Sequence, residues 1–125
     1  MASSHPPSAP LHPALAGALE EARALQARGW AVPGDATLAQ AQRLLALVLA
    51  AGWRPPTVQA DADGSLVLEW DAGARGWLQL RVDGSSQLTH SAVIEGDEYA
   101  KAEPFGDTLP DWADALLRRL LLAGH

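Results

Sequence analysis

One histidine in the middle of the chain is the clearest candidate for acid–base chemistry. His90 lies in an alternating segment, residues 88–94, and shares its face with aliphatic residues. A general base needs a cleft, an acid that orients it, and a nucleophile or water. Glu69 and Ser91 both fall in the opposite register. We therefore expect His90 to be a core or rim histidine whose hydrogen bonds are satisfied, and the alternative is a ligand pocket or enzyme site between a helix and the sheet around it.

No other residue pattern marks a catalytic or metal centre. The chain has no cysteine, which excludes disulfides, thiolate metal ligands and thiol nucleophiles. It has no Gly-x-Ser-x-Gly motif and no glycine-rich phosphate loop before a helix. Asp61, Asp63 and Gly64 match the first positions of a calcium loop, but an apolar strand follows where further oxygen ligands are needed. We expect a hairpin turn there, and neither a metal nor a cofactor.

A tryptophan on a polar strand face is the clearest candidate for binding. Trp77 alternates with Gln79 and Arg81, and Glu69 occupies the corresponding face of the preceding strand. Tryptophan is both a core residue and a frequent anchor of protein interfaces, and arginine shares the second role. If this face is open, Glu69, Trp77 and Arg81 are the expected partner-binding residues. A helix over the same face would instead bury Trp77.

Charge is distributed unevenly along the chain. The formal net charge is −6, and residues 61–114 alone carry twelve acids and three bases. Such a field could attract a basic partner, as an inhibitor or antitoxin-like protein does when it occupies a basic groove. Aspartate is also favoured in hairpin turns and helix caps, which needs no partner. The acidic balance disfavours direct binding to nucleic acid or to an anionic membrane.

Length and composition fit one small globular domain. The chain has 125 residues, of which 48% are hydrophobic and 19% charged, enough for one core and a modest surface groove. Its longest apolar run, Leu44 to Ala51, has eight residues, far fewer than the roughly 20 that span a bilayer. The N-terminus lacks the pattern of a secretory signal. We expect a cytoplasmic protein without a membrane partner.

Two helices are predicted before residue 55. Residues 1–13 hold four prolines and are typical of a disordered or extended lead-in. From Ala14 apolar residues recur at helical spacing until Gly29. Asp35 or Thr37 can cap a second helix, and its broad apolar face implies substantial burial.

Beyond the second helix the apolar period changes to two. Four segments alternate in this way, at 58–60, 66–70, 78–82 and 88–94, and a weaker fifth runs from Tyr99 to Glu103. Short turn sequences, including Asp-Gly pairs, separate them. Neighbouring strands must therefore be antiparallel, because parallel neighbours need long crossovers.

The last segment carries the start signals of a helix. Thr108, Pro110 and Asp111 stand in the order of an N-cap hydroxyl, an early proline and an acid at the third helical position. Apolar residues then recur at helical spacing as far as Leu120, and we expect this stripe to pack on the sheet. The prediction is an α+β fold with two N-terminal helices, an antiparallel four- to five-stranded meander and a C-terminal helix. We place it in a single domain at residues 14–125.

Several short motifs follow one another along the chain. They are a Gly-Trp opening at residues 29–30, the sequence DGSLVLEW at 63–70, and EPF at 103–105 before a Leu-Pro pair. Over residues 15–122 the chain resembles a group of small bacterial proteins that share a Gly-Trp opening, a "DGxxxLEW" strand pair and a closing "EPF…LP" helix. Members commonly have Asp-Gly after the first Trp, where this chain has Ala31 and Val32. The resemblance implies the boundaries of the fold and no particular activity.

Three functions are consistent with the sequence. We expect a non-catalytic module that binds a protein through the face around Glu69, Trp77 and Arg81. The alternatives are an acidic inhibitor or antitoxin-like protein, and a small-ligand carrier or enzyme with a pocket near His90. A homodimer is compatible with each, since an exposed strand edge next to Tyr99 could pair across a twofold axis.

Overall fold

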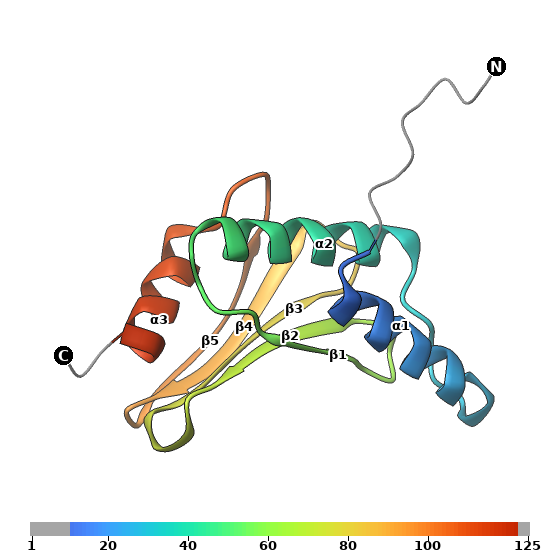
Figure 1. Ribbon diagram of the computed structural model, residues 1–125, viewed down its shortest axis with the longest axis horizontal. Helices are drawn as coiled ribbons and strands as arrows, with labels where there is room; N and C mark the ends of the chain where they lie inside the picture. The colour runs from blue at the N-terminus through green and yellow to red at the C-terminus, as the bar shows by residue number, and fades with distance from the viewer. Residues whose placement is uncertain (1–10, 123–125) are drawn as a thin grey trace.

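The computed structural model describes residues 11–122, which form an α+β fold. Three helices and five strands follow one another along this part of the chain, with two single-turn 3-10 helices, η1 and η2, between them (Figure 1). The helices are α1 (Pro13–Leu25), η1 (Gln26–Arg28), α2 (Asp35–Ala50), η2 (Gly73–Arg75) and α3 (Asp111–Leu122). The strands are β1 (Thr57–Ala60), β2 (Leu66–Asp71), β3 (Gly76–Val82), β4 (Gln87–Ile94) and β5 (Asp97–Pro104). The predicted fold class is confirmed.

The five strands form one antiparallel sheet in which the strand order is the chain order, β1-β2-β3-β4-β5. Trp70 pairs with Leu78, and Leu78 with Ala92, so the apolar registers of β2, β3 and β4 coincide. The tight turn into β5 has positive φ at both Glu95 and Gly96, as a two-residue type I′ hairpin turn requires. The segment that the sequence indicated only weakly as a fifth strand is an edge strand of eight residues.

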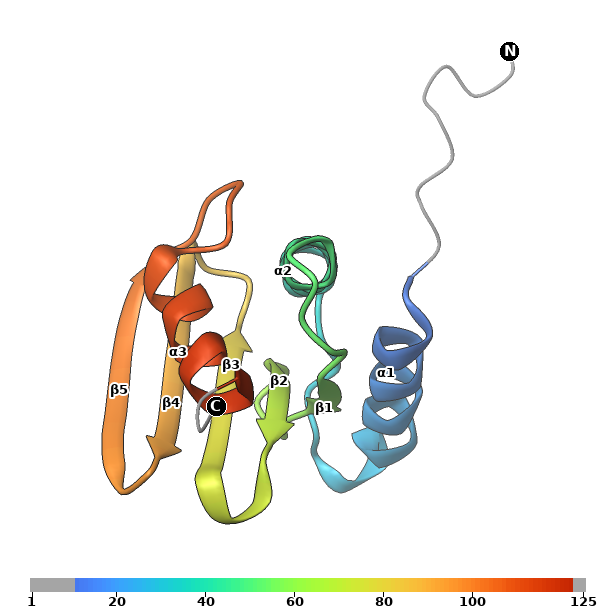
Figure 2. The ribbon, with the colours of Figure 1, turned by 60° about the vertical axis from the view of Figure 1, so that its left-hand side comes forward.

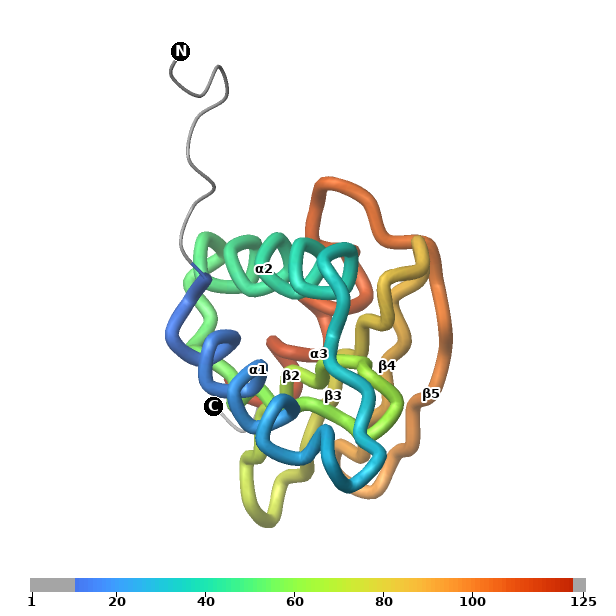
Figure 3. Tube along the Cα trace, turned by 90° about the vertical axis from the view of Figure 1, so that its right-hand side faces the viewer, coloured from blue at the N-terminus to red at the C-terminus, as the bar shows by residue number. Residues whose placement is uncertain are grey.

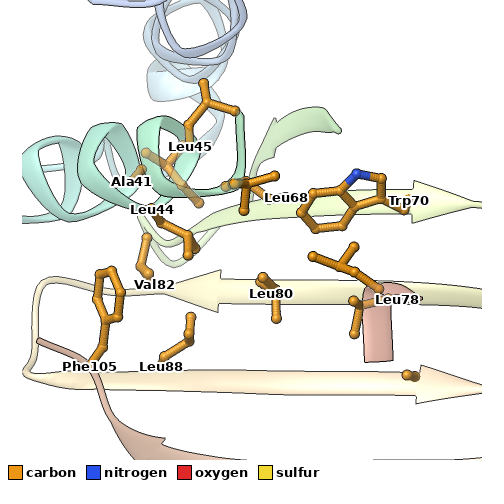
Figure 4. Close-up of a cluster of buried hydrophobic side chains, with 14 of the residues drawn as sticks. Ala41, Leu44, Leu45, Leu68, Trp70, Leu78, Leu80, Val82, Leu88 and Phe105 are labelled. Carbon is orange, nitrogen blue, oxygen red and sulfur yellow. The ribbon is translucent and has the colours of Figure 1, made fainter. Parts of the chain in front are cut away.

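The helices cover one face of the sheet. In Figure 2, α3 lies in front of β4 and β3, and α1 and β5 lie on opposite sides of the molecule. Figure 3 shows α1 running across the front of the view, below α2. Alternate strand residues are buried against the helices, and Leu44 of α2 lies over Val82 and Leu88 (Figure 4). Trp70 is the largest of the fully buried side chains, at 1% exposed.

No helix of the described residues covers the other face of the sheet. Strands β3 and β4 alternate between buried residues and residues that are partly or fully exposed, which is the pattern of a sheet with one solvated face. Within residues 11–122 no helix is long and apolar enough to cross a membrane. Residues 1–10 of the predicted lead-in lie outside the described residues, and α1 begins at Pro13.

Polar side chains join the helices to the sheet at two places. Gln40 of α2 accepts a hydrogen bond from the Gly84 backbone N–H at 2.9 Å and donates to the Ser85 carbonyl, which fixes the β3–β4 turn under the helix. At the other end of α2, the indole of Trp70 donates to the Arg54 carbonyl at 2.8 Å. The segment between α2 and β1 is thereby held against the core.

Candidate functional site

A cavity of about 390 Å³ lies between α3 and the outer strands. Its wall comes from three elements that are distant in sequence. The lining residues are His90 from β4, Tyr99, Lys101 and Glu103 from β5, and Trp112, Ala115, Leu116 and Arg119 from α3. This volume falls in the range of about 300–1,000 Å³ that is usual for small-molecule sites.

The spacing of the lining residues along β5 and α3 explains why they lie next to one another. The three β5 residues alternate along the strand, and pairing of His90 with Lys101 places them on the helix-covered face. On α3, Trp112, Ala115, Leu116 and Arg119 recur at intervals of three and four residues, so they share one side of the helix. Docking of α3 on the sheet brings the two sets face to face.

His90 is the buried polar group of this site. It is 6% exposed and its ring lies against the Trp112 indole, with ring centroids 4.2 Å apart and planes inclined by 31°. Nδ1 is buried without a hydrogen-bond partner among the described residues. Burial lowers the pKa of the imidazole, opposed by Glu103 and assisted by Lys101. The ring is therefore neutral at pH 7. It is buried, as expected of a core or rim histidine, but the expectation that its hydrogen bonds are satisfied is wrong, because Nδ1 has no partner among the described residues.

The charged groups around the cavity pair with one another. Lys101 Nζ lies 2.8 Å from Glu103 Oε1, and this contact lowers the pKa of Glu103 and raises that of Lys101. Arg119 is 2.7 Å from Asp97, donates to the Tyr99 hydroxyl, and has its guanidinium 5.8 Å from the centre of the Tyr99 ring. The cavity therefore combines an aromatic and aliphatic wall with a rim in which positive and negative charges nearly cancel.

The residue types of this lining suit the recognition of a small molecule. It contains no Ser, Thr or Cys, so it offers no hydroxyl or thiol nucleophile of the common kinds other than the Tyr99 phenol. Over residues 11–122 no three His, Asp or Glu side chains come together in a way that could hold a metal ion. The site can stack a planar group and hydrogen bond to its edge.

The structure places Glu69, Trp77 and Arg81 on the same open face of the sheet. Trp77 pairs across the strands with Asp71, and Arg81 with Val67, so about 13 Å of strand separates the two side chains. Arg81 is already engaged, with Nη1 2.7 Å from an Asp61 carboxylate oxygen. Trp77 is half-buried and lies outside the main core cluster. Of the three, Trp77 alone presents apolar surface to this face.

Turn chemistry explains part of the acidic charge. Asp63 accepts hydrogen bonds from the backbone N–H and hydroxyl of Ser65 at 2.9 and 2.6 Å, and Asp83 accepts from the Ser85 N–H at 2.9 Å. These bonds lower the pKa of both carboxyls. The side chain of Asp61 is likewise bound to Arg81, which lowers its pKa. These three carboxylates belong to the turns, whereas an inhibitor that mimics an acidic ligand would need them directed at its partner.

The sequence did not reveal most of the cavity. No protein-family model, curated protein or solved structure matches the chain. Of the lining residues, only His90 is a site residue predicted from the sequence. Tyr99 and Arg119 were missed, although the alternation of β5 and the spacing of α3 carry the signal once α3 is known to lie over β4 and β5.

Proposed function

We propose that the protein binds a small planar molecule in the cavity between α3 and strands β4 and β5. The observation that carries the proposal is His90, a polar ring held at the cavity wall against Trp112 with an unpaired Nδ1. Leaving a buried nitrogen unpaired costs roughly 1–3 kcal/mol, and an aliphatic or phenyl side chain would fill the position without that penalty. A planar ligand stacked in the cavity beside His90 and Trp112 would give this imidazole a role in binding.

The lining indicates the chemistry of the ligand. Trp112, Tyr99 and Leu116 favour an apolar, flat body, because aromatic rings pack best in offset or edge-to-face contact. The paired charges of Lys101 and Glu103 leave little net field, which favours an uncharged ligand. A polar edge on the ligand has the Lys101 ammonium and the Glu103 carboxylate to bond with. The class is a neutral heteroaromatic of about the size of indole or benzimidazole.

A substitution at Ala115 tests the proposal without altering the core. Ala115 is exposed and borders the cavity, so the phenyl group of Ala115→Phe occupies it. Benzimidazole and indole should shift the NMR signals of the His90 and Trp112 rings in the unaltered protein, and Ala115→Phe should abolish the shifts. The matched control is Ala102→Phe, at an exposed position on the other face of β5. Shifts that survive in Ala115→Phe, or that vanish equally in Ala102→Phe, would contradict the proposal.

A second candidate function is protein binding through the open face of the sheet. The observation that favours it is Trp77, a large aromatic side chain on a face that no described helix covers and outside the core cluster. Interface tryptophans contribute to binding more than to folding. Trp77→Ala should therefore lower the unfolding free energy by no more than about 1 kcal/mol, as surface substitutions do, when measured by urea denaturation. A much larger loss would show that Trp77 has a structural role.

A further inference from the structure

A second and larger cavity, of about 840 Å³, lies at the far end of α3. It is bounded by the segment that leaves α2, the end of β2, the following turn and the last turn of α3. Three arginines from these separate elements border it, Arg54, Arg75 and Arg118, against one acidic side chain, Asp71. A third of the nine basic residues of an acidic chain thus gathers at one cavity.

Each arginine is set in place by a contact with the folded structure. The Arg54 carbonyl accepts from the buried Trp70 indole, and its guanidinium donates to the Asp71 carbonyl at 2.8 Å. Arg118 lies over the Trp53 ring, with its Cζ 5.7 Å from the ring centre. Arg75 ends the 3-10 turn whose next residue, Gly76, packs against the β4 backbone. Side-chain contacts thus bring the Arg54 and Arg118 guanidinium groups to the cavity, and the backbone of the turn places Arg75 beside it.

Asp114 anchors the wall without entering the cavity lining. Its two carboxylate oxygens accept from the Trp53 indole at 2.8 Å and from Arg118 at 3.3 Å. This joins α3 to the segment after α2, so the Trp53 and Arg118 side chains keep their relative positions. Asp71 directs a carboxylate oxygen to the Gly73 N–H at 2.8 Å. The cavity lining therefore holds three arginines and one aspartate, and Asp114 pairs with Arg118 from outside the lining.

We propose that this cavity binds a small molecule with a multiply charged oxyanion, such as a diphosphate or a polycarboxylate. Guanidinium groups bond oxyanions through two parallel N–H donors, which suits both kinds of anion. Trp53 and residues Leu120–Leu122 supply an apolar wall beside the charges for the remainder of the molecule. This site is separate from the His90 cavity, and neither proposal depends on the other.

Pyrophosphate and citrate are suitable probes, because they distinguish phosphate from carboxylate recognition. Binding is measured by calorimetric titration at constant ionic strength, with sodium chloride as the reference. Arg75→Gln combined with Arg118→Gln should weaken binding about 10-fold or more, since each removes a charge-assisted hydrogen bond. Arg28→Gln is the matched control, because Arg28 also ends a 3-10 turn before a glycine but does not border the cavity.

A substitution that removes a negative charge from the cavity, rather than a positive one, completes the test. Asp71→Asn removes the one negative charge of the lining while the amide oxygen can still accept from Gly73, so the same anion should bind more tightly. If the double arginine variant unfolds, Asp71→Asn and Arg54→Gln, expected to act in opposite directions, still decide the matter. The proposal is wrong if neither anion binds above the chloride reference, or if Arg28→Gln weakens binding as much as the cavity variants do.

Discussion

The imidazole of His90 makes the stability of the fold depend on pH. Burial lowers its pKa below the ordinary value of 6.5, and the groups that face it are Lys101 and Glu103 of β5 and Arg119 of α3. The unfolded chain therefore binds a proton at a higher pH than the folded one. Between the two pKa values, the unfolding free energy rises with pH. This contribution is complete above the unfolded pKa and is lost progressively as the pH falls below 6.5.

Replacing this imidazole by phenyl should remove the dependence. We expect His90→Phe to keep the fold and to abolish the decline in unfolding free energy that the unaltered protein shows as the pH is lowered from about 7 to 5. Urea denaturation at a series of pH values measures both proteins. Parallel curves for the two would mean that the decline comes from another group.

A glycine at the start of β3 is required by its surroundings. Gly76 has φ +137°, and a Cβ placed there would lie 1.8 Å from the Val93 carbonyl oxygen. Gly73, in the same turn, also has a positive φ of +64°, but a Cβ at that residue would meet no atom within 4 Å. Gly76→Ala should cost about 3 kcal/mol or more, and Gly73→Ala only about 1 kcal/mol. Thermal unfolding of the two variants compares them, and equal losses would exclude the steric explanation.

For single residues, the sequence predicted which face of the sheet a side chain lies on better than it predicted the partners of that side chain. Alternation correctly places Trp70 and His90 on the inner face, because strand side chains alternate whatever covers them. It does not show that Nδ1 of His90 lacks a partner, since that depends on which α3 residues dock over it. The hydrogen bond from Arg81 to Asp61 was likewise not predicted, because the two residues are twenty positions apart in the sequence.

Between elements, one glutamine joins α2 to the β3–β4 turn. Gln40 is 8% exposed and holds the backbone of this turn from both its amide nitrogen and its amide oxygen. Gln40→Met keeps the volume but leaves the Gly84 N–H without its acceptor, which should cost about 2 kcal/mol. Arg43→Met, at an exposed position of α2, is the control and should change stability by less than about 0.5 kcal/mol. Chemical denaturation measures both, and equal effects would remove the special role of Gln40.

Periodicity predicted the elements well and their ends less well. The change from helical spacing to alternation identified every strand, including β5. Thr108 was expected to cap α3, yet the helix begins at Asp111, and the N–H groups of Ala113 and Asp114 bond to the Pro110 carbonyl. Local sequence allows either start. In the structure Phe105 is buried and Leu109 packs against the core before the helix begins, while Thr108 between them is exposed.

For the molecule as a whole, acid should act in two stages. The first stage is the loss of unfolding free energy that follows protonation of His90. The second stage is protonation of the carboxyls of Asp61, Asp63 and Asp83. Hydrogen bonds to Arg81, Ser65 and Ser85 lower their pKa values below 3.8. Their contribution is present above 3.8 and is lost as the pH falls through the lowered values. The double variant Asp63→Asn and Asp83→Asn should lose less stability in this acid range. Circular dichroism during acid titration measures it, and an unchanged acid limb would contradict the assignment.

The sheet order has a consequence for how fast the protein folds. Each strand pairs with its neighbour in sequence, so every hairpin closes a short loop and loses little loop-closure entropy. Folding rate rises as contacts become more local in sequence, and all-neighbour pairing is the most local form that a five-stranded sheet can take. The hydrogen bond from Trp53 to Asp114 spans all five strands and joins residues 61 positions apart. A refolding chain can assemble the meander first, and both cavities come into existence only when the last helix reaches it.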